Sequence, residues 1–270
     1  MDGSPQLHSV PAFGESTSDC LPRARRAHPG LRGLVLGYAG FGRPGATPLA
    51  HRLMPLAATV LIIDVDRGAG LVTGPRAAGR LCERERWGHG VSIGLSPAGA
   101  SALLAVPSAD LAEGVLPLTD VTGTRAAELV DRLAAAPTWE ARCATLDRLL
   151  LPHAGAEDTL ADAAWHRLHR DSARVPEVAA ALGVSRRLLE RVCRARLGHS
   201  PGRIARIARL QRAIGLIRRG LPLATVAARA GYADQPHLTR ESVALAGLTP
   251  GSLCTILQEA TGVRRRRASR

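Results

Sequence analysis

The chain has 270 residues and a formal net charge of +13, and all 36 of its basic residues are Arg. Aromatic residues make up only 3% of it, so Leu, Val, Ile and Ala must fill its cores. No run of about 18 apolar residues occurs, and residues 1–30 contain no apolar stretch typical of a signal peptide, so we expect a cytoplasmic protein with no membrane partner.

The charge is unevenly distributed along the chain. Residues 1–165 hold 15 Arg and 17 acidic residues, a net charge of −2, whereas residues 166–270 hold 21 Arg and 6 acidic residues, a net charge of +15. A bias toward Arg codons would raise Arg everywhere, but it would not remove acidic residues from one half. The asymmetry favours a nucleic-acid-binding C-terminal part attached to a non-binding N-terminal domain.

The N-terminal part has the pattern of a β-rich domain that follows an arm. Residues 1–27 are rich in Pro, Ser, Gly and charged residues without periodicity, so we expect a flexible arm. Residues 60–63 (Val-Leu-Ile-Ile) form a continuous apolar run, which predicts a central strand covered on both faces. Short apolar runs between Gly- and Pro-containing turns predict strands at residues 31–41, 59–65, 70–73 and 91–95.

Two helices are predicted next, at residues 124–135 and 139–151, each with a narrow apolar stripe and a Pro after it. Such helices either close the N-terminal domain or mediate dimerisation. Residues 152–158 are the expected linker, and everything after Leu160 has the pattern of helices and turns.

An internal repeat marks the C-terminal part. Residues 178–183 (VAAALG) recur as residues 226–231 (VAARAG). Each copy predicts a short helix, a Gly able to adopt positive φ in a sharp turn, and then a second helix. Ser185 and Asp234 are placed to cap the second helices, and Pro236 fits a first helical turn. This is the pattern of a helix-turn-helix unit.

The two second helices carry the residues that we expect to contact DNA. Leu189, Val192 and Cys193 form the inward face of the first, and Arg residues occupy its outer face, which suits the major groove. We expect Arg187 and Arg191 to read bases. The candidate DNA-binding residues are Ser185, Arg186, Arg187, Glu190, Arg191, Arg194, Arg203, Arg206, Asp234, Gln235, His237 and Arg240.

A connecting helix is predicted between the two units, at residues 201–219, with apolar residues at helical spacing. Its length of about 28 Å suits two recognition helices placed in successive major grooves, about 34 Å apart. Arg203 and Arg206 on this helix are expected to lie in solvent or near phosphates.

Residues 175–253 resemble the DNA-binding domain of AraC/XylS-type transcription regulators. The matching motifs are V-A-x3-G-x-S-x3-L-x-R at 178–191, G-x-S-P at 198–201, R-L-x2-A at 209–213, V-A-x3-G-Y-x-D-Q-x-H-x2-R-E at 226–241 and G-L-T-P at 247–250. The resemblance implies a sequence-specific regulator with two helix-turn-helix motifs. Leu238 and Ser242 stand where this family usually has Phe, and Cys193 and Leu245 where it often does, which predicts a weaker second unit.

The N-terminal region is more loosely similar to the sensor regions of a subgroup of these regulators, through residues 90–100, 103–107, 118–120 and 134–137. The resemblance implies an α+β fold in which an N-terminal α+β domain precedes an all-α DNA-binding domain. The expected division is a flexible arm at 1–27, a sensor or dimerisation domain at 28–157, an AraC-type DNA-binding domain at 158–262 and a basic tail at 263–270.

Other constellations are weaker. His166 and His169 have helical spacing, but no Cys or carboxylate completes a metal site, so we expect them on the surface. His51 and His89 are expected to be ordinary buried or loop histidines, with effector contact as the alternative. We find no catalytic constellation and expect no enzyme activity, cofactor or metal.

Double-stranded DNA is the expected partner. A small-molecule effector, a homodimer and, for an activator, RNA polymerase stay open as further partners. Two other functions also stay open: a methyl-acceptor repair enzyme fused to a DNA-reading module, with Cys20 or Cys82 as nucleophile, and a non-specific architectural DNA binder.

Overall fold

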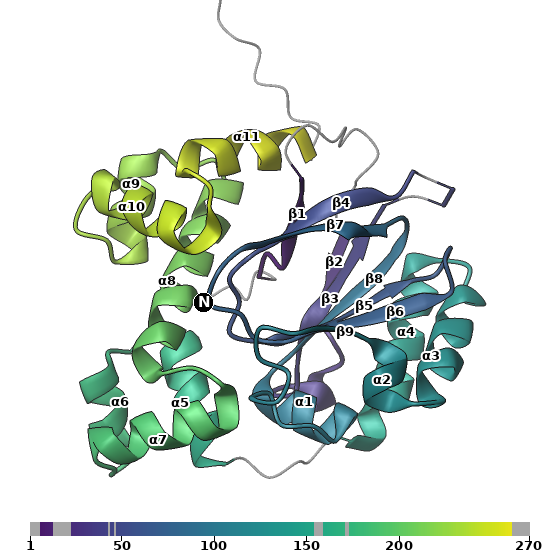
Figure 1. The fold of residues 1–270 in the computed structure, drawn as a ribbon, viewed down its shortest axis with the longest axis horizontal. Coiled ribbons are helices and arrows are strands. Elements are labelled where there is room, and N and C mark those ends of the chain that lie inside the picture. Colours follow the sequence, from purple (N-terminus) through teal and green to yellow (C-terminus); the bar gives the residue numbers. More distant parts are fainter. Residues whose placement is uncertain are drawn as a thin grey trace, which may run out of the picture.

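The computed structural model describes residues 6–12, 23–42, 44–45, 47–153, 159–170 and 173–260, without the side chains of residues 84, 85, 259 and 260. A β-rich N-terminal part, with helices on one side, lies beside a helical C-terminal part (Figure 1). The expected α+β fold class is confirmed. The predicted basic tail and residues 154–158 of the predicted linker lie outside the described residues.

Two antiparallel sheets form the N-terminal part. The smaller has the strand order β1-β4-β7 and the larger the order β2-β3-β8-β5-β6-β9. The strands are β1 (Ser9–Pro11), β2 (Arg23–Arg25), β3 (Val35–Phe41), β4 (Leu49–Leu53), β5 (Thr59–Asp64), β6 (Ala69–Thr73), β7 (Arg80–Trp87), β8 (Gly90–Leu95) and β9 (Val115–Pro117).

Strand β5 alternates its side chains between two cores. Leu61 and Ile63 face a core that four helices close, and Val60 and Ile62 face a second core on the other side of the sheet. The predicted central strand covered on both faces is therefore confirmed. The four helices are α1 (Pro97–Leu104), α2 (Leu118–Thr122), α3 (Arg125–Ala134) and α4 (Trp139–Leu150); the short 3-10 helices η1 (Pro29–Leu31) and η2 (Leu151–His153) complete this part.

The C-terminal part consists of helices only, among the residues that the structure describes. Side chains of its first helices, including Trp165, Val178 and Leu189, share the second core with Val60 and Ile62 of the N-terminal part. The helices are α5 (Leu160–His169), α6 (Val175–Ala181), α7 (Arg186–Leu197), α8 (Pro201–Arg218), α9 (Leu223–Ala230), α10 (Gln235–Ala246) and α11 (Pro250–Ala260).

The helix boundaries in the repeat follow the sequence pattern closely. Gly183 and Gly231 have φ angles of 65° and 86°, as their turns require. The Ser185 hydroxyl accepts a hydrogen bond from the Leu188 N–H at 3.1 Å, and the Asp234 carboxylate accepts one from the His237 N–H at 2.6 Å. Both predicted caps and the predicted connecting helix, α8, are confirmed.

Part of the predicted N-terminal arm is built into the fold instead. β1 pairs with β4 and β2 pairs with β3, whereas residues 1–5 and 13–22 lie outside the described residues. Both strands have three residues and lie at sheet edges. In strands of only three residues the alternation of apolar and polar side chains is too short to be recognised in the sequence. The arm could therefore be predicted only from its composition, which does not indicate strands.

Candidate nucleic-acid interface

The first helix pair, α6 and α7, presents a basic outer face. Leu189 and Cys193 are fully buried, whereas all five arginines of α7 are exposed. Glu190 is half-buried and pairs with Arg194 one turn later, at 2.8 Å. The structure thus places the predicted residues Arg186, Arg187, Arg191 and Arg194 together on one side of one helix.

The second helix pair, α9 and α10, presents a mixed polar face. Gln235 and Arg240 are exposed near the start and middle of α10. His237 is half-buried, with its ring edge-on to Tyr232 at 5.2 Å between centroids. Its Nδ1 also accepts a 3.4 Å hydrogen bond from the Ala233 N–H. His237 therefore packs and caps, with part of its surface open to a ligand.

Helix α8 joins the two pairs through a network around Glu241. This carboxylate is buried, and Arg209 Nη2 lies 2.8 Å from each of its oxygens. Arg206 Nε lies 3.3 Å from it, and the Tyr232 hydroxyl donates to it at 3.3 Å. Burial, followed by the Glu241 charge, raises the pKa of Tyr232 and keeps that hydroxyl protonated. Arg206, predicted to lie in solvent or near phosphate, is exposed, as Arg203 is, and it also pairs with Glu241.

The positions that lack the expected aromatic residues are accommodated differently. Leu238 is fully buried in the core of the second pair. Ser242 is also fully buried, and its hydroxyl donates to the Leu248 carbonyl at 2.7 Å, just beyond the end of α10. That hydrogen bond offsets the cost of burying a hydroxyl, which the sequence had left unexplained. The expectation of a weaker second unit remains a prediction.

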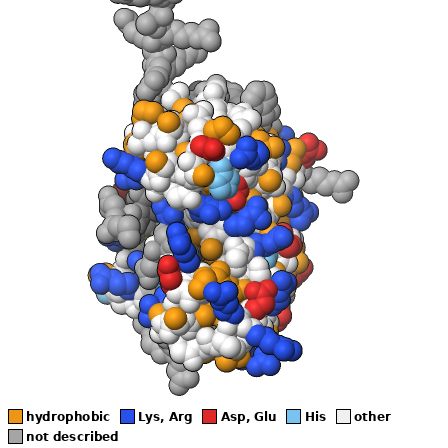
Figure 2. Space-filling view, turned by 90° about the vertical axis from the view of Figure 1, so that its left-hand side faces the viewer, with side chains coloured by type: hydrophobic (Ala, Val, Ile, Leu, Met, Phe, Trp, Pro, Cys, Tyr) orange, Lys and Arg blue, Asp and Glu red, His pale blue; other side chains and the backbone are white. Residues whose placement is uncertain are grey.

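The exposed arginines lie on the side of the molecule that the C-terminal helices form. Figure 2 views this side, where blue side chains occur over the whole face and gather across its middle, with red ones scattered among them. At neutral pH such a surface attracts a polyanion.

Several other predicted residues lie elsewhere. His169 is buried, stacks on Trp165 at 4.1 Å and hydrogen-bonds Gln6, so its predicted surface position is wrong. His169 follows Trp165 by one helical turn on the buried side of α5, so its ring stacks on the indole instead of facing solvent. His51 stacks on Trp87 inside the second core, and His89 lies in a loop between Asp66 and Arg142.

The sites for alternative chemistry have little support in the described residues. Cys82 is buried, at 2% exposure, which leaves no access for an alkylated base; Cys20 lies outside the described residues. Within the described ranges, no three His, Cys, Asp or Glu residues gather as a metal site would require.

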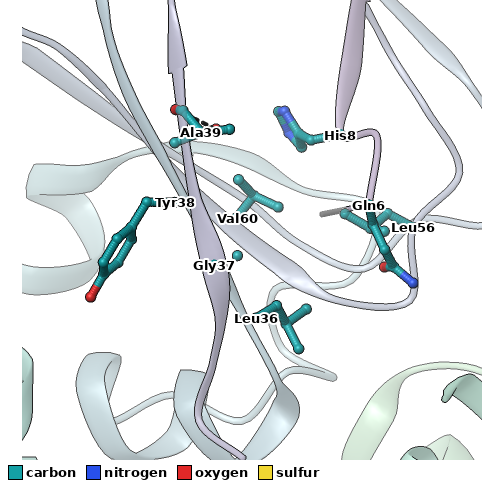
Figure 3. Close-up of a pocket in the computed structure, with 10 residues that line it drawn as sticks. Gln6, His8, Leu36, Gly37, Tyr38, Ala39, Leu56 and Val60 are labelled. Carbon is teal, nitrogen blue, oxygen red and sulfur yellow. Dashed lines mark hydrogen bonds between the residues drawn. The ribbon is translucent and has the colours of Figure 1, made fainter. Parts of the chain in front are cut away.

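A small pocket opens beside β3. Gln6 and His8 lie on one side of it and Leu36 on β3, while the Tyr38 ring points to the opposite side of that strand (Figure 3). Its volume is about 40 Å³, and at roughly 10–15 Å³ of such volume for each water it is large enough for a few water molecules. A metabolite is larger than this space.

Sequence reasoning missed the residues that join the two parts of the chain. Gln211 is buried in α8, and its side chain bonds the backbone of Leu7 twice, at 2.9 and 3.0 Å, and the Pro55 carbonyl at 2.7 Å. The available signal was a polar side chain within the apolar stripe of a helix, which requires a buried partner.

The family comparison agrees with the geometry of the two helix pairs. Residues 178–255 match the family described as a helix-turn-helix domain. Similar solved structures include ToxT from Vibrio cholerae O395 bound to (E)-4-(8-methylnaphthalen-1-yl)but-3-enoic acid, with 12% identity, 88% of this chain and 99% of that chain covered, and a TM-score of 0.47. Unsaturated fatty acid-bound wild-type ToxT from Vibrio cholerae strain SCE256 is also similar, with 11% identity, coverage of 94% and 100%, and a TM-score of 0.44. No curated protein matches the chain.

The fold and the basic face define a DNA-binding protein of the helix-turn-helix class. The matched domain, residues 178–255, is a helix-turn-helix domain of the AraC type. None of the helices that the structure describes is both long and apolar enough to cross a membrane.

Proposed function

We propose that α7 and α10 are recognition helices that read one bipartite DNA site in successive major grooves, under the control of the N-terminal part. The observation that carries the proposal is their common attachment to α8. Ile204 and Ile207 of α8 share a core with the first pair, and Ile214 and Ile217 share a core with the second. The 18 residues of α8 span about 27 Å, close to the separation of about 34 Å between successive grooves.

The exposed side chains suggest distinct roles within this arrangement. Arg187 and Arg191 are the proposed readers of guanine, because a free guanidinium can donate to both major-groove acceptors of that base. Gln235 is the proposed reader of adenine. Arg203 and the remaining exposed donors are proposed to contact phosphates, which position the protein without reading sequence. Ser185 and Asp234 would act through the helix starts that they cap.

The N-terminal part is the proposed sensor or dimerisation domain, at residues 28–157, and residues 158–262 form the proposed DNA-binding domain. A small-molecule effector, a second copy of the chain and, for activation, RNA polymerase are its proposed further partners in the cytoplasm. The protein has no proposed catalytic role.

Selection of bound duplexes from a random DNA library, with the full-length protein, tests the proposal. We expect one bipartite sequence to be enriched, with specific binding at least ~10³-fold tighter than non-specific binding. Similar affinity for all duplexes would instead indicate an architectural binder.

Arg191→Ala then tests base reading. This variant should lose about 1–3 kcal/mol of specific binding and relax the preference at one base. Arg125→Ala, which removes an exposed arginine of α3 in the N-terminal part, is the matched control and should bind as the wild type does. A uniform loss over all sequences for Arg191→Ala would reassign the residue to phosphate contact.

A further inference from the structure

Two loops of the N-terminal part contact the C-terminal ends of the two proposed recognition helices. At the end of α7, the Ala109 N–H donates to the Arg196 carbonyl at 3.2 Å. Gly198, which ends that helix, lies so close to the same loop that a Cβ added there would be 2.6 Å from the Ala112 Cβ. The first loop, residues 107–114, therefore packs backbone against backbone on α7.

The end of α10 is held in the same manner by a second loop, residues 74–79. The Gly79 N–H donates to the Leu245 carbonyl at 2.6 Å. A Cβ added at Gly79 would lie 2.7 Å from the Ala246 carbonyl oxygen, which real Cβ atoms essentially never do. The φ angle of Gly79 is not positive, so its backbone conformation alone would tolerate another residue. The lack of space for a Cβ is therefore what requires glycine at this contact.

Glu113 joins the two loops to each other. Its N–H donates to the Pro75 carbonyl at 2.8 Å, and its carboxylate accepts from the Ala77 N–H at 2.8 Å. The same carboxylate lies 3.8 Å from Nε2 of His199, in the turn between α7 and α8. Glu113 has a φ of +59°, a left-handed conformation that costs a non-glycine residue energy and persists only where surrounding contacts impose it.

These contacts leave the opposite ends of both helices open. α7 and α10 lie with α8 on the left in Figure 1, and the sheets that carry the two loops lie to the right. Recognition helices contact base edges mainly through their N-terminal residues. The loops hold the ends that do not read DNA, so the docking is compatible with binding.

We infer that Glu113 is a positioning residue for DNA recognition: by tying loop 74–79 to loop 107–114, it makes the N-terminal part set the separation of α7 and α10, and with it the preferred spacing of the two DNA half-sites. The inference rests on the proposed function. It means that the two loops of the N-terminal part, in addition to α8, fix the separation of α7 and α10.

Binding to duplexes of altered spacing tests this inference. The selected site is compared with versions that have one base pair inserted or deleted between its half-sites, and with each half-site alone. One base pair moves a half-site by about 3.4 Å and rotates it by about 34°. We expect the wild type to lose affinity steeply with either change.

Glu113→Ala should narrow the affinity ratio between correct and shifted spacing by about 2- to 30-fold, the range of couplings carried by single network residues. Its affinity for single half-sites should stay at the wild-type value. Glu113→Gln keeps an oxygen that accepts from the Ala77 N–H and should retain most of the spacing preference. Glu128→Ala, which removes an exposed carboxylate from α3, should not alter it.

Two glycine substitutions test the inference if Glu113→Ala fails to fold. Gly79→Ala places a methyl against the end of α10, whereas Gly251→Ala in α11 meets nothing nearer than 3.7 Å. The first should change the spacing preference and the second should not.

An unchanged ratio in a folded Glu113→Ala or Gly79→Ala protein would overturn the inference and leave α8 alone as the spacer. Failure of the wild type to select any sequence would instead refute the proposed function. The two failures are therefore distinguishable.

Discussion

Replacing Glu241 with Ala removes the carboxylate that joins α8 to α10. The Glu241 side chain is 7% exposed and contacts Arg209, Arg206 and the Tyr232 hydroxyl. Without it, the Arg209 guanidinium, which also lies over the Tyr232 ring at 4.9 Å, loses its anionic partner. The loss should appear first in the stability of the protein.

The size of the loss in stability can be estimated from the exposure of the two arginines that contact Glu241. Arg209 is 29% exposed and its two short contacts count as hydrogen bonds to a charged group, each worth about 1.5–3 kcal/mol. Arg206 is 47% exposed, so solvent reduces its share to a fraction of 1 kcal/mol, as for surface pairs. Since water reaches Arg209 after the substitution, we expect a net loss of about 2–3 kcal/mol in the free energy of unfolding. The midpoint of thermal unfolding should fall by about 4–12 °C.

Urea and thermal unfolding, followed by circular dichroism, measure the loss. Glu190→Ala is the matched control, because it removes a half-buried carboxylate, 43% exposed, that pairs with Arg194 within one helix, a contact worth only about 0.3–0.5 kcal/mol. A double-mutant cycle with Arg209→Ala isolates the pairwise energy. If Glu241→Ala were no more destabilising than Glu190→Ala, or if the cycle gave no coupling, the reasoning would be refuted.

Two further predictions concern the junction of the two parts. Gln211→Leu leaves the Leu7 and Pro55 backbone groups without their partner; at about 1–3 kcal/mol for each buried unsatisfied group, unfolding in urea should show a loss of about 2 kcal/mol or more, and wild-type stability would contradict the assigned contacts. Burial lowers the pKa of His51 from 6.5 to about 4, so the unfolded chain binds a proton more readily and stability falls as the pH drops from 6.5 to 4. At about 1.4 kcal/mol for each pH unit, this decline approaches 3 kcal/mol. His51→Phe, which keeps a ring beside Trp87, should flatten it in urea midpoints, and an unchanged pH dependence would contradict this assignment.

The features that could be predicted from the sequence are those decided within a few residues. A Ser or Asp before a helix caps it whatever surrounds it, and a glycine at a sharp turn permits a positive φ. For this reason Ser185, Asp234, Gly183 and Gly231 have their predicted roles. The continuous run at residues 60–63 could likewise be interpreted, because only a strand buried on both faces tolerates such a run.

The features that could not be predicted depend on partners distant in the chain. Arg206 and Arg203 follow the same pattern on α8 and are both exposed, and only the position of Glu241, 35 residues further along, gives Arg206 an ion-pair partner. His169 has a surface-like spacing with His166, yet Trp165 and Gln6 enclose it. No periodicity encodes such contacts, because the tertiary fold creates them.

The shared second core gives the proposed control by the N-terminal part a direct physical route. Val60 and Ile62 of β5 pack in the same cluster as Leu189 of α7 and Ile204 of α8. Close-packed interiors transmit displacement rather than absorb it, so a shift of the sheet must move the first helix pair or open a gap beside it. The second pair meets the N-terminal part through Gly79 and through the cluster around Val10 and Met54. We therefore expect any event that repacks the sheets to change the relative position of α7 and α10, on which binding to the proposed bipartite DNA site depends.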